Sequence, residues 1–349
     1  MTKVAIIILI YNGLRYLRPL FNSLNQQAKD GLSLEIIVVD NHSSDGSVKF
    51  IKDNFPEVTL IENRENLGFA AGNNLGLVYA LKKNFDYLVL INQDIIVTPL
   101  WLVLLLKGLV GDRQSGLAQP LILSWPNKEK INSSGNILHY LGVGFSGNNG
   151  LNYERADNFP REINYASGAA MAVKREVLEK IGLFDETFFM YHEDTDLSLK
   201  AKFLGYKIIL VPEAIVYHQY EFSKSIKKFY FIERNRLIIL LKFYKILTLI
   251  LIFPAWLFLE IGFLVQAIFT GFIKQRIKIY WYFINPGNLS KILKARVPIQ
   301  KTRIISDKKL LKELTGKIEF QEVNNVFLKF IFNPILNAYK KLVEKIIIW

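Results

Sequence analysis

The sequence of 349 residues contains no cysteine. A disulfide scaffold, a thiolate metal site and a cysteine nucleophile are therefore excluded, and the composition fits a reducing compartment. Two phosphate-binding glycine patterns are missing as well. Tyr11-Asn12-Gly13 stands where a Gly-x-Gly-x-x-Gly would follow the first apolar run, and no Gly-x-x-x-x-Gly-Lys-Ser/Thr occurs. These absences argue against a Rossmann-type dinucleotide site and against a P-loop.

No secretory signal peptide is visible. The apolar run from Val4 to Ile10 is short and leads into Tyr-Asn-Gly instead of a small-residue cleavage site. The net charge of +13 is spread unevenly, because residues 274–349 hold 16 Lys and Arg against 5 Asp and Glu. This basic part flanks the most apolar stretch of the chain. We therefore expect an anionic membrane surface as its partner and no nucleic acid.

The first half of the sequence alternates short apolar runs with segments of helical periodicity. Strands are expected at 3–10, 34–39, 58–62 and 86–91, and helices at 14–27, 47–54, 72–83 and from Pro99 onward. Later strands are expected at 165–173 and 207–211, a helix at 194–204, and a loop over the Gly-, Asn- and Ser-rich residues 132–150. Strand, helix and strand joined by short connections predict an α/β fold with a mostly parallel sheet flanked by helices.

The character of the chain changes after residue 222. We expect a basic linker helix at 224–245, an apolar segment at 246–273 and a basic, partly amphipathic tail at 274–349. The apolar segment carries one charge, Glu260, and as one helix would measure about 42 Å at about 1.5 Å per residue. Pro254 and Gly262 interrupt it, and basic clusters lie on both sides. A bent hairpin in one leaflet fits best, while a buried helix pair and a full span stay open.

Two acids stand directly after apolar strands. Asp40 ends the run Glu-Ile-Ile-Val-Val-Asp, and Asp94 follows Tyr-Leu-Val-Leu-Ile-Asn-Gln. In open α/β sheets, ligands bind at this end of the strands. Asp94, a distant histidine and substrate phosphates would suffice to hold Mg²⁺ or Mn²⁺. The alternatives are an Asx turn with a helix cap at Asp40 and a simple hairpin turn at Asp94.

Three further acids, Glu193, Asp194 and Asp196, crowd the start of a predicted helix beside aromatic residues. The helix dipole favours acids at such a position, which explains one or two of them. Three acids next to apolar surface suggest a general base whose pKa is raised by desolvation. His218 ends a strand-like run about two dozen residues later, where it is either a core histidine or a metal ligand.

Six short motifs, in their order along the sequence, resemble those of a known family. The motifs are IIILIYN (6–12), VVDNHSSDGS (38–47), ENLGFAAGNN (65–74), NQD (92–94), SGAAM (167–171) and HEDTDL (192–197). Together they resemble the family 2 glycosyltransferases, and most closely the rhamnosyltransferase-type enzymes of bacterial surface-polysaccharide synthesis. The resemblance covers about residues 3–240. It implies a GT-A fold at 1–223, with a nucleotide-sugar half at about 1–98 and an acceptor half at about 99–223. The membrane-associated helical region expected from the composition follows this domain.

The resemblance also implies roles for single residues. Asp194 would be the catalytic base, with Glu193 beside it, and Asp94 and His218 would hold a divalent cation, Mg²⁺ or Mn²⁺. The residues expected to bind the nucleotide sugar are Tyr11, Asp40, Asn66, Gly68, Asn73, Asn92, Asp94, Asp196, Arg234 and Arg236. Two positions depart from the family pattern. Asn92 replaces the first acid of the metal motif, and Lys200 stands where an arginine is usual.

The implied reaction is a single in-line displacement that inverts the anomeric carbon. The Gln-x-x-Arg-Trp signature of processive synthases is absent, so we expect transfer of one sugar per encounter. The expected donor is dTDP-L-rhamnose or a UDP-hexose, and the expected acceptor is a polyprenyl-diphosphate-linked saccharide at the cytoplasmic face of the membrane. A sugar nucleotidyltransferase and a catalytically inactive membrane scaffold are the competing interpretations.

Overall fold

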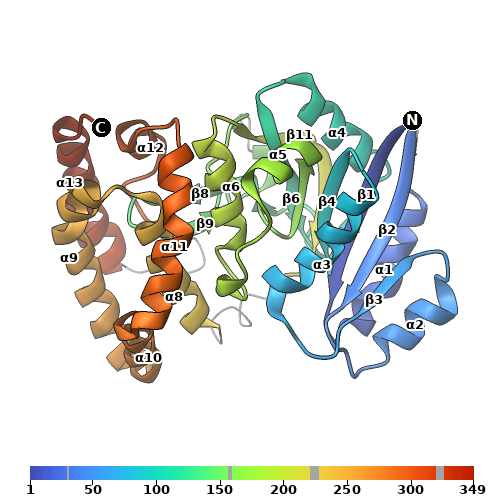
Figure 1. Ribbon diagram of the computed structural model, residues 1–349, viewed down its shortest axis with the longest axis horizontal. Coiled ribbons are helices and arrows are strands. Elements are labelled where there is room, and N and C mark those ends of the chain that lie inside the picture. The colour runs from blue at the N-terminus through green and yellow to red at the C-terminus, as the bar shows by residue number, and fades with distance from the viewer. Residues whose placement is uncertain (30, 156–158, 221–227, 320–325) are drawn as a thin grey trace. The chain divides into compact units, whose positions relative to one another are not determined.

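The computed structural model describes residues 1–29, 31–155, 159–220, 228–319 and 326–349. The chain forms two compact units, whose helices and strands are labelled in Figure 1. Unit 1 consists of Met1–Asn136, Ser146–Lys202 and Tyr206–Tyr220, and unit 2 of Ile137–Phe145, Phe203–Gly205 and Glu221–Trp349. The expected boundary at residue 223 lies outside the described residues. Both expected halves of the N-terminal domain share the sheet of unit 1.

Unit 1 is built on one nine-stranded sheet in the order β3-β2-β1-β4-β10-β6-β11-β5, with β7 paired to β6. The strands are β1 (Thr2–Ile10), β2 (Leu32–Asp40), β3 (Thr59–Glu62), β4 (Tyr87–Asn92), β5 (Ile95–Val97), β6 (Ser115–Ser124), β7 (Ile131–Ser133), β10 (Ala170–Lys174) and β11 (Lys207–His218). The first four strands are parallel, β10 is antiparallel to β4 and β6, and β11 is parallel to β6. The expected α/β class is confirmed.

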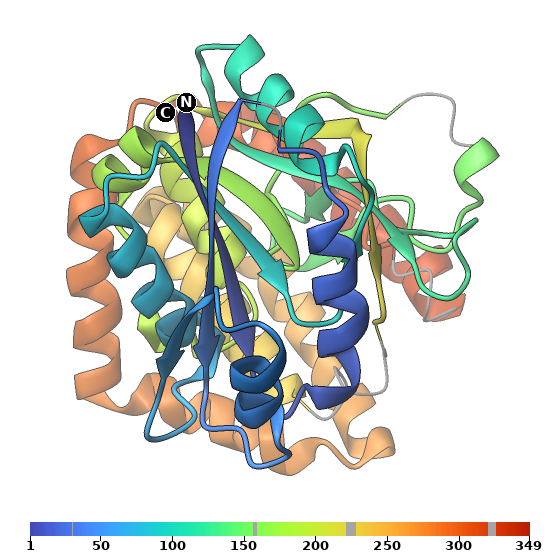
Figure 2. The same ribbon diagram turned by 90° about the vertical axis from the view of Figure 1, so that its right-hand side faces the viewer.

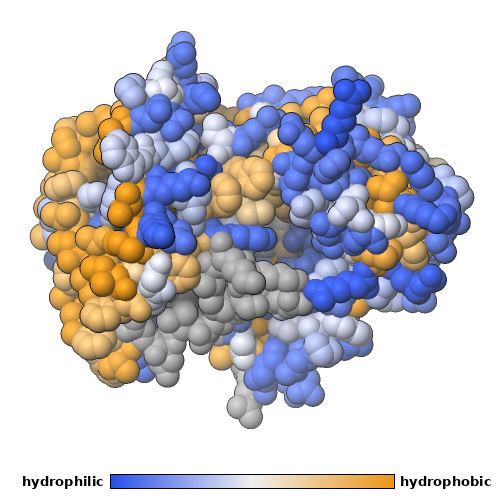
Figure 3. Space-filling view, turned by 90° about the horizontal axis from the view of Figure 1, so that it is seen from below, coloured by the Kyte–Doolittle hydropathy of each residue, from blue (hydrophilic) through white to orange (hydrophobic). Residues whose placement is uncertain are grey.

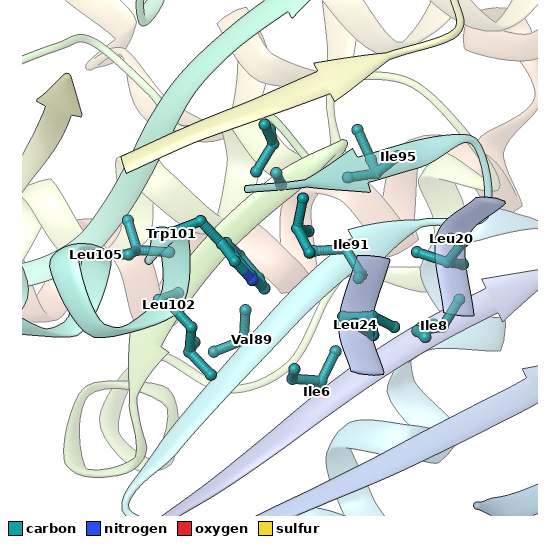
Figure 4. Packing of buried hydrophobic residues seen from close by; sticks show 14 of the residues in the cluster. Ile6, Ile8, Leu20, Leu24, Val89, Ile91, Ile95, Trp101, Leu102 and Leu105 are labelled. Atoms are coloured by element: carbon teal, nitrogen blue, oxygen red, sulfur yellow. The ribbon is translucent and has the colours of Figure 1, made fainter. Parts of the chain in front are cut away.

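Helices cover both faces of this sheet. They are α1 (Leu14–Asn25), α2 (Ser47–Asn54), α3 (Gly68–Lys82), α4 (Trp101–Gly111), α5 (Arg175–Ile181) and α6 (Glu193–Phe203). Alternate residues of β1 serve the two faces, because successive strand side chains point to opposite sides. Ile6 and Ile8 pack with Leu20 and Leu24 of α1 (Figure 4). Figure 2 shows α3 on the other side of β1 and β2.

The close approach of α3 to β1 depends on two glycines four residues apart. A Cβ at Gly72 would lie 2.5 Å from a methyl carbon of Leu9, and one at Gly76 would lie 2.6 Å from a methyl carbon of Ile7. Larger side chains would push the helix off the sheet. Because α3 begins at Gly68, its seat on β1 fixes where its first turn lies.

Several expected boundaries differ from the structure. The helix expected from residue 72 begins at Gly68, and the strand expected at 207–211 continues to His218. The strand expected at 165–173 is the shorter β10, while Tyr165 makes an isolated bridge to Asn136. The expected loop at 132–150 contains β8 (Asn136–Leu138) and β9 (Gly144–Ser146), which pair with each other.

Unit 2 is mainly helical. Its helices are α8 (Phe229–Phe243), α9 (Ile246–Thr270), α10 (Ile273–Ile284), α11 (Pro286–Thr302), α12 (Asp307–Glu313) and α13 (Asn333–Ile346), with a π-helix, η3, at Leu328–Phe332. Within the described residues, α9 alone is long and apolar enough to cross a membrane, judged by length and composition. A buried ion-pair cluster lies between α8, α9 and α10, and its members are Glu233, Arg236, Glu260 and Arg276.

The apolar segment differs from the expected hairpin. The single helix α9 continues through Pro254 and Gly262 and ends before Gly271, whose φ of +78° is left-handed. Pro254 removes one helical hydrogen bond without ending the helix. Gly262 serves packing, since a Cβ there would lie 2.5 Å from the ring of Phe332.

Candidate active site

The strand ends of unit 1 bring the sequence-predicted acids to one edge of the sheet. Asp40, the last residue of β2, pairs with Ile10 of β1, and Asn92, the last residue of β4, pairs with Leu9 of β1. Strands in a sheet lie about 4.8 Å apart, so Asp40 and Asn92 are separated by about 10 Å. Asp94 follows in the turn between β4 and β5. This edge is the carboxyl end of the parallel strands.

Side-chain hydrogen bonds hold the turns at this edge together. The amide of Gln93 binds the backbone of Tyr11, with its Oε1 accepting from the Tyr11 N–H at 2.9 Å and its Nε2 donating to the Tyr11 carbonyl at 3.2 Å. Asn12 is held by two serines of the turn after β2. Its backbone N–H donates to Ser43 Oγ, and its side-chain Oδ1 accepts from the Ser44 N–H. Tyr11 itself is exposed beside the edge.

Asp40 and Asn41 are both buried, and each organises a different turn. The Asp40 carboxylate accepts from the N–H groups of His42 and Ser43, the latter at 3.0 Å. The Asn41 amide reaches the turn that precedes α3. It donates to Asn66 Oδ1 and to the Gly68 carbonyl, and it accepts from the Asn63 amide and the Leu67 N–H, all at 2.9–3.0 Å.

Asp94 and His218 meet at the end of the antiparallel pair formed by β5 and β11. His218 pairs with Ile95, and His218 Nε2 lies 3.3 Å from Asp94 Oδ1. The other ring nitrogen, Nδ1, lies 3.1 Å from the Oδ1 of Asn132. Asp94 Oδ1 is buried and has no hydrogen-bond partner among the described residues. The structure thus brings together the two residues expected to hold a metal.

The chemistry of this pair fits a divalent cation. With Nδ1 bound to the Asn132 oxygen, a neutral ring carries its proton on Nδ1 and turns the lone pair of Nε2 toward Asp94 Oδ1. Two electron-rich atoms so close repel each other unless a proton or a cation is shared between them. Ligands at right angles around Mg²⁺, each about 2.1 Å away, are about 3 Å apart.

Two protein ligands leave room for substrate phosphates and water around such an ion. Nowhere in the described part of the chain do three or more His, Asp or Glu side chains gather as a ligand set. A cation held here would therefore depend on the substrate for most of its ligands.

Asp194 is connected to the same edge through the loop before β10. The Asn92 N–H donates to the Ala169 carbonyl, and the neighbouring Gly168 N–H donates to Asp194 Oδ2 at 3.0 Å. Asp194 Oδ1 accepts from the Thr195 N–H at 2.7 Å. A Cβ on Gly168 would lie 3.6 Å from the Asp194 Cβ, so the loop and the helix are in contact.

Burial changes the acidity of the two adjacent carboxyls. It raises the pKa of Asp194, against the opposing effect of the hydrogen bonds from Gly168 and Thr195. The pKa of Glu193 is raised well above its usual range, first by burial and then by the negative charge of Asp194. Its Oε2 is buried and makes no hydrogen bond to a described residue. At neutral pH these conditions make Asp194 a stronger base than a solvated aspartate.

The segment before α6 is docked onto the first turn of α3. Three residues there have left-handed backbone angles, namely Phe189, Tyr191 and His192, with φ of 62–67°. The carbonyl of Phe189 accepts from the N–H groups of Phe69 and Ala70. A Cβ on Gly68 would lie 2.5 Å from the Phe189 ring, so only glycine fits at this contact.

The remaining predicted residues of unit 1 have specific partners. Asn66 Oδ1 accepts from Asn41 and from the Gly68 N–H, and the Asn73 side chain donates to the Phe69 carbonyl of its own helix. Asp196 is fully buried and lies 3.3 Å from the ammonium of Lys200. Lys200 also donates to the Leu183 carbonyl, so it acts there as a point charge without bidentate geometry.

Arg234 and Arg236 belong to unit 2, whereas the other predicted site residues belong to unit 1. Arg236 is buried and binds Glu233, Glu260 and the Leu141 carbonyl. Arg234 binds Asn235 and stacks over aromatic rings of its own unit. The structure therefore gives Arg236 structural partners, and a contact of either arginine with a diphosphate stays a prediction.

Sequence reasoning missed four residues that shape this edge: Asn41, Gln93, Asn132 and Phe189. Asn41 and Gln93 lie inside the recognised motifs, directly before or after a predicted site aspartate. Their position next to Asp40 and Asp94 could have identified them as site residues. Asn132 and Phe189 reach the site through long-range contacts and an unusual backbone angle. Periodicity and composition carry no trace of either.

A sheet of this topology with carboxylates and a histidine at its carboxyl edge is the arrangement of a GT-A glycosyltransferase. The family model described as glycosyl transferase family 2 matches residues 5–182, just over half of the chain. The chain belongs to this family. The expectation drawn from the motifs is confirmed at the family level.

Two relatives share a rhamnosyl function in their names. N-acetylglucosaminyl-diphospho-decaprenol L-rhamnosyltransferase of Mycobacterium tuberculosis is 26% identical over 203 residues, which cover 53% of this chain and 66% of the relative. The dTDP-rhamnosyl transferase RfbF of Shigella flexneri is 24% identical over 232 residues, covering 65% of this chain and 72% of the relative. The match thus spans just under two thirds of the mycobacterial relative. The expected similarity to rhamnosyltransferase-type members is confirmed.

A solved structure shares the fold. GalNAc-T7, crystallised with UDP, GalNAc and Mn²⁺, superposes with a TM-score of 0.53 at 19% sequence identity, over 63% of this chain and 44% of its own. At this identity the similarity concerns the fold, and it confirms the expected GT-A architecture.

Proposed function

We propose that this chain transfers one sugar from a nucleoside-diphosphate sugar to a hydroxyl of an acceptor, with inversion at the anomeric carbon. One observation carries the proposal. A half-buried carboxylate at Asp194 and an Asp94–His218 pair lie at the same carboxyl edge of a family 2 sheet, linked through Asn92, Ala169 and Gly168. A base and a cation site at one edge are what a single displacement requires.

Asp194 accepts the proton of the attacking acceptor hydroxyl. The hydroxyl oxygen forms a bond to the sugar C1 while the bond from C1 to the diphosphate oxygen breaks, and the nucleoside diphosphate leaves with the electron pair. Attack from the side opposite the leaving group inverts C1. The Gly168 and Thr195 hydrogen bonds hold the carboxylate in position for this step.

Asp94 and His218 would hold the cation, and Asn132 orients the histidine ring. A bound divalent cation supplies positive charge for the departing diphosphate. Asp40, at the end of β2, is proposed to contact the base or ribose of the nucleotide. The neighbouring turn that Asn41 holds completes this side of the site.

The donor is proposed to be dTDP-L-rhamnose and the acceptor a polyprenyl-diphosphate-linked saccharide. Support comes from the names of the two relatives, one acting on a diphospho-decaprenol substrate and the other transferring from dTDP-rhamnose. Such an acceptor places the enzyme at the cytoplasmic face of the membrane. A UDP-hexose is the alternative donor within the same fold.

The proposal is tested by incubating the purified chain with single nucleotide sugars, Mn²⁺ and a polyprenyl-diphosphate N-acetylglucosamine acceptor. Acceptor-dependent release of nucleoside diphosphate from one donor is expected, and the product's new linkage should show the inverted configuration by NMR. A parallel incubation contains a nucleoside triphosphate and a sugar phosphate instead. Release of inorganic diphosphate in that incubation would indicate a nucleotidyltransferase. No turnover with any donor would support an inactive scaffold.

A matched variant separates specific from general effects. Asp53 is an exposed aspartate of α2 that pairs with Lys49, away from the edge. Asp53→Asn should retain wild-type turnover under conditions in which Asp94→Asn loses it. Equal loss in both variants would argue against the assigned site.

A further inference from the structure

Helix α9 presents apolar side chains on two opposite sides. One stripe is buried against its own unit and consists of Thr248, Ile252, Ala255 and Leu259. The opposite stripe is exposed along the whole helix, and its members are Ile246, Ile250, Phe253, Leu257, Ile261, Val265 and Ile268. Their spacing of three or four residues places them on one side of a helix. A helix on a water-facing surface would carry polar residues there.

The apolar surface continues onto neighbouring segments of unit 2. On α10 the exposed residues are Ile277, Trp281 and Ile284, and before η3 they include Val326 and Phe327. Both segments lie beside α9, since α10 contacts it and Phe332 stacks on Phe258 at 4.7 Å. Figure 3 shows hydrophobic side chains gathered over these helices. We name this surface, made by the exposed residues of α9 and α10, the α9 face. Apolar patches of this kind mark interaction sites.

The exposed charge of this part of the chain is almost entirely positive. Among the described residues from 245 to 349, twelve lysines are exposed, against one exposed acid, Glu319. Lys245 and Lys274 stand at the two ends of α9. A partner that is apolar inside and negatively charged at its surface matches both properties, and an anionic lipid bilayer has them. The exposed Trp281 is of the type that favours the boundary between lipid and water.

Glu260 prevents α9 from standing alone in a bilayer. Its carboxylate lies in the buried cluster with Arg236 of α8 and Arg276 of α10, and Tyr280 also donates to it. A spanning helix would draw these two arginines into the hydrocarbon or leave Glu260 unpaired, and both are costly. With one side packed along its length and the other exposed, α9 suits a position parallel to the membrane plane.

We propose that the α9 face docks on an anionic lipid bilayer, with α9 lying in the plane of the interface and both of its ends on the same side. The inserted groups are the large exposed side chains of α9 and α10, and the flanking lysines contact the headgroups. This inference does not depend on the proposed reaction. Vesicle binding is measured without donor or acceptor, so failure of either proposal leaves the other standing.

The first test uses the full chain and phosphatidylcholine vesicles with or without phosphatidylglycerol. Binding is expected to the anionic vesicles and to weaken at high salt, because exposed charges are screened. The double variant Phe253→Asp, Ile261→Asp should bind at least about tenfold more weakly. Val110 of unit 1 and Ile261 are both 54% exposed, so Val110→Asp is the matched control and should bind as the wild type does.

Three results would overturn the proposal. One is unchanged vesicle binding by the double variant while its thermal melting matches that of the wild type. Another is an equal loss in the Val110→Asp control. The third is self-association of the wild type in solution that the double variant abolishes, with no vesicle binding, since the face would then join two copies of the chain.

A second test decides between lying in the interface and spanning. Because the chain has no cysteine, Lys245→Cys and Lys274→Cys each introduce one reporter without background. A membrane-impermeant maleimide added outside protein-bearing vesicles should label both variants to the same extent. Protection of one position until detergent is added would show that α9 crosses the bilayer and would overturn the in-plane arrangement.

Discussion

The carbonyl oxygen of Phe189 accepts a hydrogen bond from the backbone N–H of Phe69 at 2.6 Å. Phe69 lies in the first turn of α3, beside the nucleotide side of the site, and Phe189 lies four residues before the acids of α6. The contact satisfies an N–H that the helix leaves unpaired at its start. It connects the turn held by Asn41 to the segment that precedes Asp194, the proposed base, so both parts of the candidate site depend on this contact.

The contact between Phe69 and Phe189 should tolerate no side chain at Gly68. Alanine at 68 combines a left-handed φ of +81° with a Cβ 2.5 Å from the Phe189 ring and 2.6 Å from its carbonyl oxygen. We expect Gly68→Ala to lower the free energy of unfolding by roughly 2–4 kcal/mol and to weaken donor binding. Gly271 has a similar φ of +78° and open space around it, so Gly271→Ala should cost about 1 kcal/mol. Equal costs in denaturant titrations would rule out the docking role.

Asn41 should act as a positioning residue for the nucleotide side. Asn41→Ala removes four hydrogen bonds made by a buried side chain, which should cost roughly 2–3 kcal/mol. The KM for the donor should rise more than kcat falls, because the variant disturbs binding and leaves Asp194 in place. Asn54, exposed and bound to its own helix, offers the control Asn54→Ala, with a change within about 0.5 kcal/mol. A fall in kcat at constant KM would contradict this role.

Glu193 should make stability depend on pH. Its pKa in the folded chain is raised by burial and by Asp194, so the folded state holds the proton more tightly than the unfolded state. The contribution of Glu193 to stability is therefore greatest below the ordinary glutamate pKa of about 4.3 and is lost as pH rises through the raised value. Glu193→Gln removes this loss, so its melting temperature should exceed that of the wild type at neutral pH. The difference should shrink on acidification, and a difference independent of pH would refute the account.

The cation site should depend on His218 and on the residue that orients it. His218→Ala removes one of the two proposed protein ligands, and Asn132→Ala removes the hydrogen-bond partner of the ring, and each change should weaken Mn²⁺ binding about 10- to 100-fold. Electron paramagnetic resonance titrations of Mn²⁺ with nucleoside diphosphate present measure this directly. Asp112 is a half-exposed aspartate paired with Lys207, so Asp112→Asn is the control and should bind Mn²⁺ as the wild type does. Unchanged Mn²⁺ affinity in His218→Ala would remove the histidine from the site.

The sequence predicted the fold class because the parallel strands are buried on both faces and therefore appear as continuous apolar runs. One central strand, β6, escaped detection. It contains Pro120, which usually indicates an edge strand or no strand. In the structure Pro120 pairs with Val211 where the register of β11 shifts before Ile215, so the missing N–H falls at an irregularity in the ladder.

The candidate site could be predicted as far as its acids, because carboxylates that follow apolar strands gather at one edge of a parallel sheet. The residues that hold these acids in position could not be predicted. Asn132 reaches His218 across 86 residues of sequence, and the left-handed Phe189 owes its conformation to the surrounding contacts. The apolar composition of 246–273 indicated a membrane association but not which side of the helix is exposed. Which side of the helix is exposed depends on the burial of Glu260 with Arg236 of α8 and Arg276 of α10.

Asp194 tests the central claim most directly. In Asp194→Asn the amide oxygen can still accept the hydrogen bond from Gly168, while the carboxylate that we propose takes the proton is gone. The account predicts that this variant binds nucleoside diphosphate and Mn²⁺ as the wild type does but loses acceptor-dependent sugar transfer by at least about a hundredfold. Near-normal transfer by Asp194→Asn, in a protein with unchanged melting behaviour, would contradict it.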